Sequence, residues 1–332
     1  MSIEAAAFRE AIDLIRRSRE IVLACHQGPD GDALGSMLAL QLALRTQGVN
    51  AIASWGSDPF VVPKHYAFLP RLDGLTPPEG VPAEPELMIT FDCGSFERLG
   101  TLEPNARKAG ALVVVDHHVS NDRFGSVNLI DAEVAASAVV TYWLIKELGI
   151  ALDRDIATCL YTGILTDTGC FKYRNTTPEI HAIAGDLLSF DIAHDEIARI
   201  VYDTHPVGYL KLLADALERA EVIPDANMIW TWITSADLDR HNVEIEDTEG
   251  IIDAVRTADV AEVACVLKQV RDGEGGYKVS MRSKGAVNVG AICEAFGGGG
   301  HAFAAGFTGN GSDPRATVEK VAERLREGSS AR

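Results

Sequence analysis

The sequence predicts an α/β protein: a doubly wound, mainly parallel five-stranded sheet, followed by a smaller α/β domain with a mixed sheet. In the first half of the chain, short and almost wholly apolar segments alternate with segments of helical periodicity. This alternation is typical of a parallel sheet covered on both faces. The pattern becomes mostly helical near the middle, and strand-like segments return after it. The length of 332 residues agrees with about two domains.

The elements of the first domain follow from the spacing of the apolar residues. Helical spacing predicts helices at 3–18, at 33–47 before Gly48, and at 134–149 closed by Gly149. The expected strands are short apolar runs at 21–25, 51–55, 87–91, 111–115 and 127–130.

The second half begins with mostly helical segments from about 153 to 221, one of them starting at Thr177 as N-cap. Strand-like residues return at 221–234, 260–270 and 277–283, the last two joined by the turn DGEGG. Asn288 can cap a short helix over 289–296, and a last helix is expected over 313–326. We therefore expect a catalytic domain over 1–190, a helical linker over 191–222 and a second domain over 223–328, the two domains being joined by helices.

The composition excludes several classes of function. A net charge of −18 argues against a broad basic surface, so long nucleic acid is not an expected partner. No apolar run approaches the roughly 18 residues of a membrane span, and the N-terminal residues lack the apolar core of a secretory signal, so no membrane partner is expected. Six scattered cysteines without a CxxC pair favour a reduced, cytoplasmic protein over a zinc ribbon.

Acidic and histidine side chains follow the ends of several predicted strands, which is where doubly wound sheets bind their ligands. Each one alone is explained equally well as a turn residue, a helix cap or a surface histidine. Four separate segments that place such residues at one edge are hard to explain in that way. The residues are His26, Asp30 and Asp32 in HQGPDGDALGS, Asp92 in FDCGS, Asp116, His117 and His118 in VDHHVSN, and Asp167 in GILTDTGCFKYRNTT.

Aspartate and histidine ligands without cysteine suit Mn²⁺, with Mg²⁺ or Fe²⁺ as alternatives. So many carboxylates would repel one another unless cations lay between them. Two metal ions that share one carboxylate would resolve the repulsion and would support phosphoryl chemistry. The glycines of HQGPDGDALGS form neither G-x-G-x-x-G nor GK[ST], so dinucleotide or Walker-type phosphate binding is not supported.

A second group of candidate residues lies far downstream. Arg282 and Lys284 end a predicted strand, and the segment FGGGGHAFAAGF brings Gly299 and Gly300 before His301. Consecutive glycines allow the backbone to approach an anion closely, and an arginine can hold a phosphate with two hydrogen bonds. The alternative is a flexible linker, although its flanking segments are apolar and patterned.

Taken in order, the segments HQGPDGDALGS, FDCGS, VDHHVSN and LTDTGCFKYRNTT resemble the four motifs of the DHH phosphoesterase family. The segment RSKGAVNVGAICEAFGGGGHAFAAGF resembles the GGGH-containing domain that accompanies DHH domains in one branch. The resemblance covers roughly residues 20–310. The length and layout are similar to those of enzymes that hydrolyse short oligoribonucleotides (nanoRNA) and the nucleotide pAp, 3′-phosphoadenosine 5′-phosphate.

The resemblance implies two Mn²⁺ ions, with Mg²⁺ or another divalent ion as alternatives, and assigns each candidate residue a role. Asp92 would bridge the two ions, Asp116 would orient the neighbouring histidine, and His118 would contact the scissile phosphate as general acid or charge stabiliser. The remaining roles are metal binding by His26 and Asp30 at one ion and by Asp32, His117 and Asp167 at the other, and binding of the substrate's other phosphate or base by Arg282, Gly299, Gly300 and His301.

Short oligoribonucleotides and nucleotide phosphates are therefore the expected partners, together with a second copy of the chain in a homodimer. A cyclic-dinucleotide phosphodiesterase would carry the same motifs and stays open. A non-catalytic nucleotide or metal sensor would be expected to lack a ligand or His118, and all are present. A pyrophosphatase of the same superfamily would carry a different second domain, and a RecJ-like exonuclease would need additional domains.

Several neighbouring residues have weaker functional interpretations. Cys25, Cys93 and Cys170 adjoin the site segments and could affect the metal, but small buried residues at strand ends are the simpler interpretation. Asn175, with Arg174, could touch substrate or only begin a helix. Trp230 and Trp232 lie two apart on one strand face, which favours a place in the core over base stacking.

Overall fold

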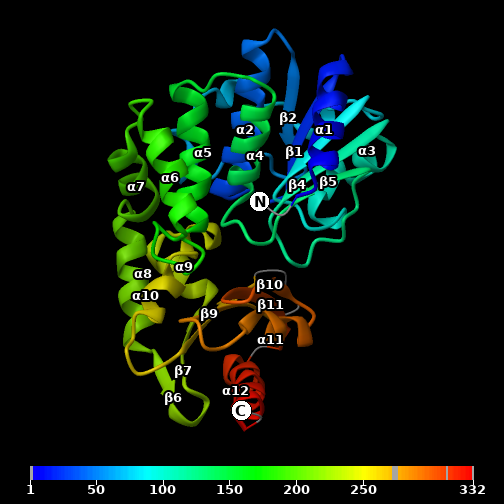
Figure 1. Cartoon of the computed structure of the whole chain (residues 1–332). Coiled ribbons are helices and arrows are strands. Elements are labelled where there is room, and N and C mark those ends of the chain that lie inside the picture. The colour runs from blue at the N-terminus through cyan, green and yellow to red at the C-terminus, as the bar shows by residue number, and fades with distance from the viewer. Residues whose placement is uncertain (1–2, 271–275, 312, 331–332) are drawn as a thin grey trace. The chain divides into compact units, whose positions relative to one another are not determined.

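A computed structural model describes residues 3–270, 276–311 and 313–330 and divides into two compact units, Met1–Asp203 and Thr204–Arg332 (Figure 1). The division falls inside the segment 191–222, in which the sequence predicts a helical linker. Helix α7 (His194–Tyr202) precedes the division and helix α8 (Val207–Glu218) follows it. No helix in the described ranges combines the length and the apolar character needed to cross a membrane.

The sheet of the N-terminal unit has five strands, all parallel, in the order β2-β1-β3-β4-β5. This confirms the predicted doubly wound sheet. The chain winds from β1 to β2 in one direction and from β3 to β5 in the other, so the strand order reverses between β1 and β3. The carboxyl ends at such a switch point are where open α/β sheets bind ligands. The strands are β1 (Ile21–Cys25), β2 (Ala51–Trp55), β3 (Leu87–Phe91), β4 (Ala111–Asp116) and β5 (Val127–Ile130).

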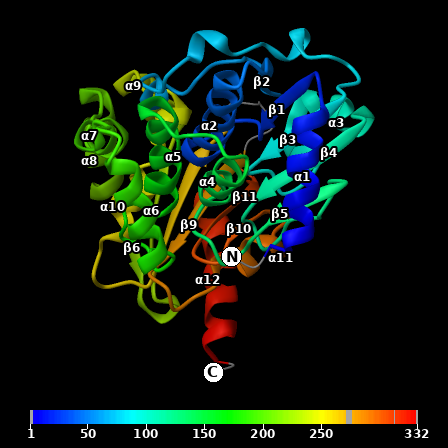
Figure 2. The ribbon, with the colours of Figure 1, turned by 45° about the horizontal axis from the view of Figure 1, so that its top comes forward.

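Both faces of this sheet are buried, because successive strand residues pack into two different apolar clusters. Leu23 belongs to the cluster beneath the larger helices, whereas Val22 and Ala24 belong to the cluster on the other face. Figures 1 and 2 show α2, α4 and α5 side by side on the first face. That layer contains α1 (Ala5–Arg17), α2 (Gly31–Thr46), α4 (Ser137–Glu147) and α5 (Arg154–Asp167), and the other face is covered by the 3₁₀ helix η4 (Glu97–Leu102) and α3 (Glu103–Lys108).

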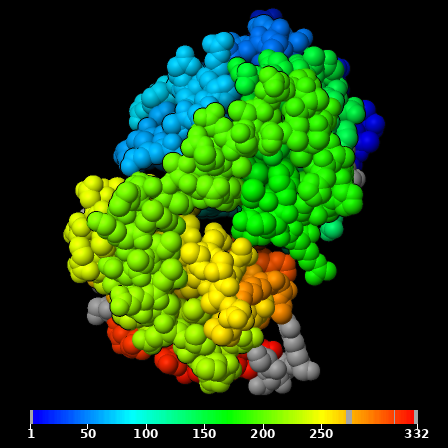
Figure 3. All heavy atoms as spheres, turned by 90° about the vertical axis from the view of Figure 1, so that its left-hand side faces the viewer, coloured from blue at the N-terminus to red at the C-terminus, as the bar shows by residue number. Residues whose placement is uncertain are grey.

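The remaining elements of this unit are peripheral. Helix α6 (Pro178–Leu188) begins after Thr177, whose hydroxyl accepts a hydrogen bond from the amide of Ile180, as the sequence predicted. Helices α6 and α7 form the outer layer that faces the viewer in green in Figure 3. Short 3₁₀ helices occupy Lys64–Tyr66, Leu72–Gly74 and Pro78–Gly80 between β2 and β3.

Helices α2 and α5 approach so closely that glycine is required at their contact. A Cβ on Gly35 would lie 2.4 Å from the backbone oxygen of Cys159, and one on Gly163 would lie 2.8 Å from Oδ1 of Asp32. Atoms at these distances clash. The two glycines therefore bring the backbone of α5 directly against the first turn of α2, which carries candidate metal ligands.

The C-terminal unit contains a mixed six-stranded sheet in the order β10-β11-β9-β8-β7-β6, as expected of the second domain. Only β7 and β8 run parallel; the other neighbours are antiparallel. One apolar cluster joins the sheet to α11 and α12, and another joins it to α8, α9 and α10. The further elements are β6 (Glu221–Ile223), the 3₁₀ helix η5 (Pro224–Ala226), β7 (Met228–Ile233), α9 (Ser235–His241), the 3₁₀ helix η6 (Ile245–Thr248), α10 (Ile251–Arg256), β8 (Val263–Gln269), β9 (Gly276–Ser283), α11 (Val289–Ala295), β10 (Gly299–His301), β11 (Ala304–Asn310) and α12 (Pro314–Ser330).

The sequence interpretation missed the hairpin of β10 and β11. Glycine is depleted in strands, so a run of four glycines gives no strand signal. These glycines are needed by the pairing: a Cβ on Gly298 would lie 2.1 Å from the backbone oxygen of Gly306, and Gly300 has a φ of 136°. The flexible-linker alternative is therefore wrong for this segment. The expected turn DGEGG, apart from Gly276, lies outside the described residues.

Candidate metal centre and active site

The structure brings the candidate residues of the N-terminal unit together at the carboxyl edge of its sheet. His26 follows β1 and Asp92 follows β3, on either side of the switch point. The other residues come from the end of β4 and from two helix ends: Asp116, His117 and His118 at β4, Asp30 and Asp32 at the start of α2, and Asp167 at the last residue of α5.

The first cluster consists of His26, Asp30 and Asp92, whose ligand atoms lie within 4.8 Å of one another. The Nε2 atom of His26 is 3.8 Å from Oδ2 of Asp30 and 3.5 Å from Oδ2 of Asp92. Its other ring nitrogen, Nδ1, is 2.9 Å from the backbone oxygen of Gln27. A hydrogen bond from Nδ1–H to that carbonyl fixes the ring and leaves Nε2 directed at the two carboxylates, as in many metal-binding histidines.

The second cluster consists of Asp32, Asp92 and His117, all buried. The Nε2 atom of His117 is 3.4 Å from Oδ1 of Asp92, 3.9 Å from Oδ2 of Asp32 and 3.1 Å from Oδ2 of Asp167. Asp92 therefore presents one carboxylate oxygen to each cluster. This is the arrangement expected of a carboxylate shared between two neighbouring cations.

Asp92 has an unusual backbone conformation for a residue with a side chain. Its φ of 54° is left-handed, a conformation that costs energy for residues other than glycine and concentrates at functional sites. The backbone amide of Asp92 donates to Val115, and the hydroxyl of Ser137 donates to its Oδ1 at 3.0 Å. These hydrogen bonds stabilise the strained residue and aim its carboxylate between the two clusters.

Asp32 serves as the missing cap of helix α4. The residue before that helix, Ala136, has no side chain that can cap it. Instead the amides of Ser137 and Ala138 donate to Oδ2 and Oδ1 of Asp32 at 2.6 and 2.8 Å. A carboxylate at a helix N-terminus accepts orphan N–H groups and interacts favourably with the helix dipole. Both oxygens of this candidate ligand are thereby held in place by a second helix.

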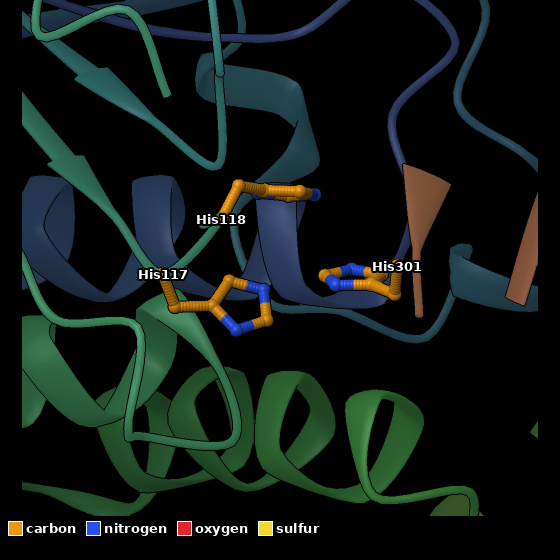
Figure 4. A group of neighbouring side chains, drawn as sticks. All are labelled: His117, His118 and His301. Carbon is orange, nitrogen blue, oxygen red and sulfur yellow. The ribbon is translucent and has the colours of Figure 1, made fainter. Parts of the chain in front are cut away.

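The third group, Asp116 and His118, lies beside the clusters. Oδ1 of Asp116 is 2.7 Å from Nδ1 of His118 and accepts hydrogen bonds from the backbone amides of His117 and His118. The side-chain amide of Asn121 donates to the other oxygen of Asp116 and to the backbone of Cys93. Figure 4 shows the imidazoles of His117 and His118 side by side. Their ring centroids are 4.8 Å apart and the ring planes are inclined at 64°. Asp116 thus orients the ring of His118.

Within the part of the chain that the structure describes, the ion pairs of these carboxylates are with histidines and not with lysine or arginine. Burial and the carboxylate of Asp92 raise the pKa of Asp32 well above its usual value, and burial raises that of Asp167 to about 6. Burial would lower the pKa of His26, but Asp30 and Asp92 outweigh it and raise that pKa to about 10. The carboxylates therefore compete for the few available protons and attract positive charge.

This donor set fits divalent cations. Four carboxylates and two imidazoles converge at this edge of the sheet, and cysteine contributes no ligand atom to the groups found among the described residues. Burial raises the pKa of Cys93 to about 12, so its thiol stays protonated, and its Sγ–H donates to the backbone oxygen of Ser95. Oxygen and imidazole ligands of this kind suit Mn²⁺ and Mg²⁺ better than a structural zinc site.

The remaining predicted site residues belong to the C-terminal unit. Arg282 lies on β9 and is half-buried, and its register partner on β11 is Ala304. Gly299, Gly300 and His301 form β10, where they pair with β11. His301, which Figure 4 also labels, is exposed. Within the unit, β9 and β10 thus belong to one sheet and lie on either side of β11.

Two positioning residues, Ser137 and Asn121, are absent from the residues that the sequence singled out. Ser137 lies in the plain apolar segment AASAVV, and its partners are 45 and 105 residues away. The one available signal was the lack of a capping residue before α4. Asn175 has a structural role: its amide donates to the backbone oxygens of Asp167 and Ala135.

Trp230 and Trp232 are stacked on each other with ring centroids 5.0 Å apart. Trp230 is buried and Trp232 is half-buried at the edge of the same cluster, in agreement with the predicted role in the core. Of the three cysteines beside the site, Cys25 and Cys93 are buried and Cys170 is half-buried.

Comparison with known proteins supports the same conclusion for both units. The model of the DHH family N-terminal domain matches residues 20–164, and the model of the DHHA1 domain matches residues 227–327. A Thermus thermophilus protein named bifunctional oligoribonuclease and PAP phosphatase NrnA is 33% identical over 308 residues, covering 92% of this chain and 89% of its own.

Two further relatives span most of the chain. A probable manganese-dependent inorganic pyrophosphatase of Streptococcus mutans is 26% identical, covering 80% of this chain and 79% of its own. The crystal structure of an exopolyphosphatase-related protein from Bacteroides fragilis superimposes with a TM-score of 0.89 at 26% identity and covers 98% of both chains. With both domain models matched in order and a relative that aligns over almost the whole length, this chain belongs to the DHH phosphoesterase family, in the branch that carries a DHHA1 domain.

Proposed function

We propose that this protein is a divalent-metal phosphoesterase that hydrolyses short oligoribonucleotides and pAp to mononucleotides and AMP. The observation that carries the proposal is the shared carboxylate of Asp92, which faces His26 on one side and His117 on the other. The name and the length coverage of the Thermus thermophilus relative support the choice of substrates. A cytoplasmic location, which six free thiols support, and a homodimer are part of the proposal.

Two Mn²⁺ ions are the proposed cofactors, and the manganese-dependent relative supports this metal. His26, Asp30 and Asp92 would hold one ion, and Asp32, Asp92, His117 and Asp167 would hold the other. When bound, such ions supply an activated water and neutralise the charge that develops on a phosphoryl group. The side chains of the protein would then place the substrate phosphate and stabilise the leaving group.

His118 is the proposed catalytic residue. Because Asp116 engages its Nδ1 atom, Nε2 is the nitrogen that can meet a phosphoryl oxygen or donate a proton to the leaving oxygen. Asp116 keeps the imidazole in that orientation and Asn121 keeps Asp116 in place. In the second unit, Arg282 and the segment Gly299, Gly300 and His301 are proposed to bind the substrate's other phosphate or base, as an arginine fork and open backbone amides do.

The test is a panel of substrates with Mn²⁺ added or removed: pAp, di- to pentaribonucleotides, linear and cyclic dinucleotides, and pyrophosphate. The expected result is Mn²⁺-dependent hydrolysis of pAp and the short oligoribonucleotides. Asp92→Asn should abolish it, whereas Asp191→Asn, a change at an exposed aspartate, should not. Preference for cyclic dinucleotides would replace the proposed substrate, and equal activity of wild type and Asp92→Asn would refute the metal centre. If both are inert, the proposed two-metal hydrolysis is refuted as well.

A further inference from the structure

A tyrosine of helix α7 binds the end of the helix that carries one of the candidate metal ligands. Helix α5 ends at Asp167, whose Oδ2 atom is 3.1 Å from Nε2 of His117. The hydroxyl of Tyr202, the last residue of α7, donates to the backbone oxygens of Leu165 and Thr166 at 3.1 and 3.3 Å. One hydroxyl thus binds two carbonyls of the last turn of α5, directly before the candidate ligand.

The chain leaves α5 through a strained turn, so the place of Asp167 depends on the contacts that hold this turn. Gly169, Cys170 and Phe171 have φ values of 55°, 60° and 60°. A left-handed conformation is costly for residues with a side chain and persists only where the surrounding structure holds it. Amides of the turn bind the same two carbonyls, and Tyr202 adds a donor from a different helix. Its hydroxyl therefore ties the strained end of α5 to α7.

The rest of α7 is only lightly buried. Within this helix, all of which the structure describes, Ile197 is the one buried residue, and no side chain caps the first turn. The ring of Tyr202 is half-buried against the main apolar cluster, and Nζ of Lys172 lies 5.5 Å from the ring centroid. The next residue, Asp203, is the last of the N-terminal unit. The hydroxyl of Tyr202 is thus a contact between the helix of Asp167 and the point where the chain leaves this unit.

We propose that Tyr202 is a positioning residue that couples metal binding at Asp167 to the packing of the end of α7 on α5. The proposal rests on the proposed function, because it takes Asp167 as a metal ligand, and it adds a means of regulating that centre. By fixing the carbonyls before Asp167, the hydroxyl holds the carboxylate beside His117. Coupling between two sites is reciprocal, so a bound cation stabilises the packed end of α7 by the factor by which that packing strengthens metal binding.

The first measurement is a calorimetric Mn²⁺ titration of Tyr202→Phe, which removes the hydroxyl and keeps the ring. The net contribution of a neutral hydrogen bond corresponds to about a 2- to 10-fold change in an equilibrium constant, so Mn²⁺ should bind this variant more weakly by about that factor. The matched control is Tyr142→Phe, which removes another hydroxyl hydrogen bond of the same unit, to Asp186 at 2.7 Å. The control should keep the wild-type affinity.

The second measurement is hydrogen exchange of the backbone amides at 199–203 in the full chain, with and without saturating Mn²⁺. In the wild type, Mn²⁺ should slow this exchange by about the factor that Tyr202→Phe loses in affinity. In Tyr202→Phe, Mn²⁺ should leave the exchange unchanged, whereas Tyr142→Phe should behave like the wild type. A purely structural role of the hydroxyl would instead speed exchange equally with and without metal.

Weaker Mn²⁺ binding by Tyr202→Phe, together with loss of the Mn²⁺-dependent protection, supports the coupling. An affinity of Tyr202→Phe equal to that of Tyr142→Phe, or protection by Mn²⁺ that persists in Tyr202→Phe, overturns it. A wild type that binds no Mn²⁺ refutes the metal centre of the proposed function and the coupling with it. A wild type that binds Mn²⁺ but hydrolyses none of the proposed substrates counts against the proposed function alone.

Discussion

Replacing Ser137 with alanine deletes one hydroxyl from the edge of the metal centre and little else. The backbone amide of Ser137 still donates to Asp32, because it belongs to helix α4. The hydrogen bond that disappears is the one from the hydroxyl to Oδ1 of Asp92, 3.0 Å long and buried. The variant therefore tests what the orientation of the shared carboxylate contributes.

The magnitude follows from the type of hydrogen bond. A neutral hydroxyl that donates to a buried carboxylate contributes about 1.5–3 kcal/mol. Loss of such a partner of a metal ligand typically weakens metal binding by about 10- to 100-fold. Asp92 also has a left-handed backbone conformation, which is strained for a residue other than glycine, so its orientation depends strongly on each of its hydrogen bonds. We expect Ser137→Ala to bind Mn²⁺ about 10- to 100-fold more weakly than the wild type.

The assay is a calorimetric Mn²⁺ titration, paired with kcat and KM at saturating metal. Ser54→Ala is the matched control, because Ser54 is also fully buried in the same unit and no hydrogen bond to its hydroxyl is found among the described residues. Ser54→Ala should keep the wild-type affinity. If Ser137→Ala binds Mn²⁺ within about twofold of the wild type, the hydroxyl does not position Asp92 and the reasoning is wrong.

Three further changes test other parts of the structure. His118→Asn should lower kcat by about 10²- to 10⁴-fold while Mn²⁺ affinity in the titration stays the same, and a comparable loss of metal would instead make it a ligand. Gly35→Ala should lower the free energy of unfolding in urea by about 1–3 kcal/mol, because the new methyl group would clash with the backbone of α5. The control Gly185→Ala, in open space on α6, should be neutral or stabilising by up to about 1 kcal/mol. Equal effects of the two changes would refute the close contact between α2 and α5. Burial raises the pKa of Asp237, but its hydrogen bonds with Arg219 outweigh this and hold it well below the usual range. The resulting stability is present above about pH 4, the pKa of the unfolded aspartate, and is lost as the pH falls further. Arg219→Met should remove about 1–3 kcal/mol at neutral pH and flatten the stability curve below pH 4, and an unchanged curve would contradict the pairing.

The edge of the sheet at which the candidate residues meet could be predicted from the sequence, because it depends only on where the strands lie and on their parallel direction. The apolar runs locate the strands, and parallel strands bring their carboxyl ends to one edge. His26 and Asp92 then lie beside each other whatever the details of the side chains, since β1 and β3 are neighbours. The same holds for His117 at the end of β4, which pairs with β3.

The contacts that orient these residues could not be predicted in this way. The cap of α4 by Asp32 joins segments 105 residues apart and depends on the exact start of two helices. The sequence placed those starts at 33 and 134, whereas they lie at Gly31 and Ser137. The hairpin of β10 and β11 escaped notice for another reason: its glycines satisfy a steric demand of the pairing, which periodicity does not measure.

The capping of α4 by Asp32 has a consequence for anyone who needs a folded but inactive protein. A substitution at Asp32 exposes two amide donors inside the helical layer, so a loss of turnover after it would mix altered chemistry with an altered scaffold. His118 lies at the margin of the same edge and leaves that cap intact. A substitution at His118 is therefore suited to a variant that binds substrate without turnover for crystallography. A substitution at Asp32 instead measures how far the stability of the fold depends on one of its metal ligands.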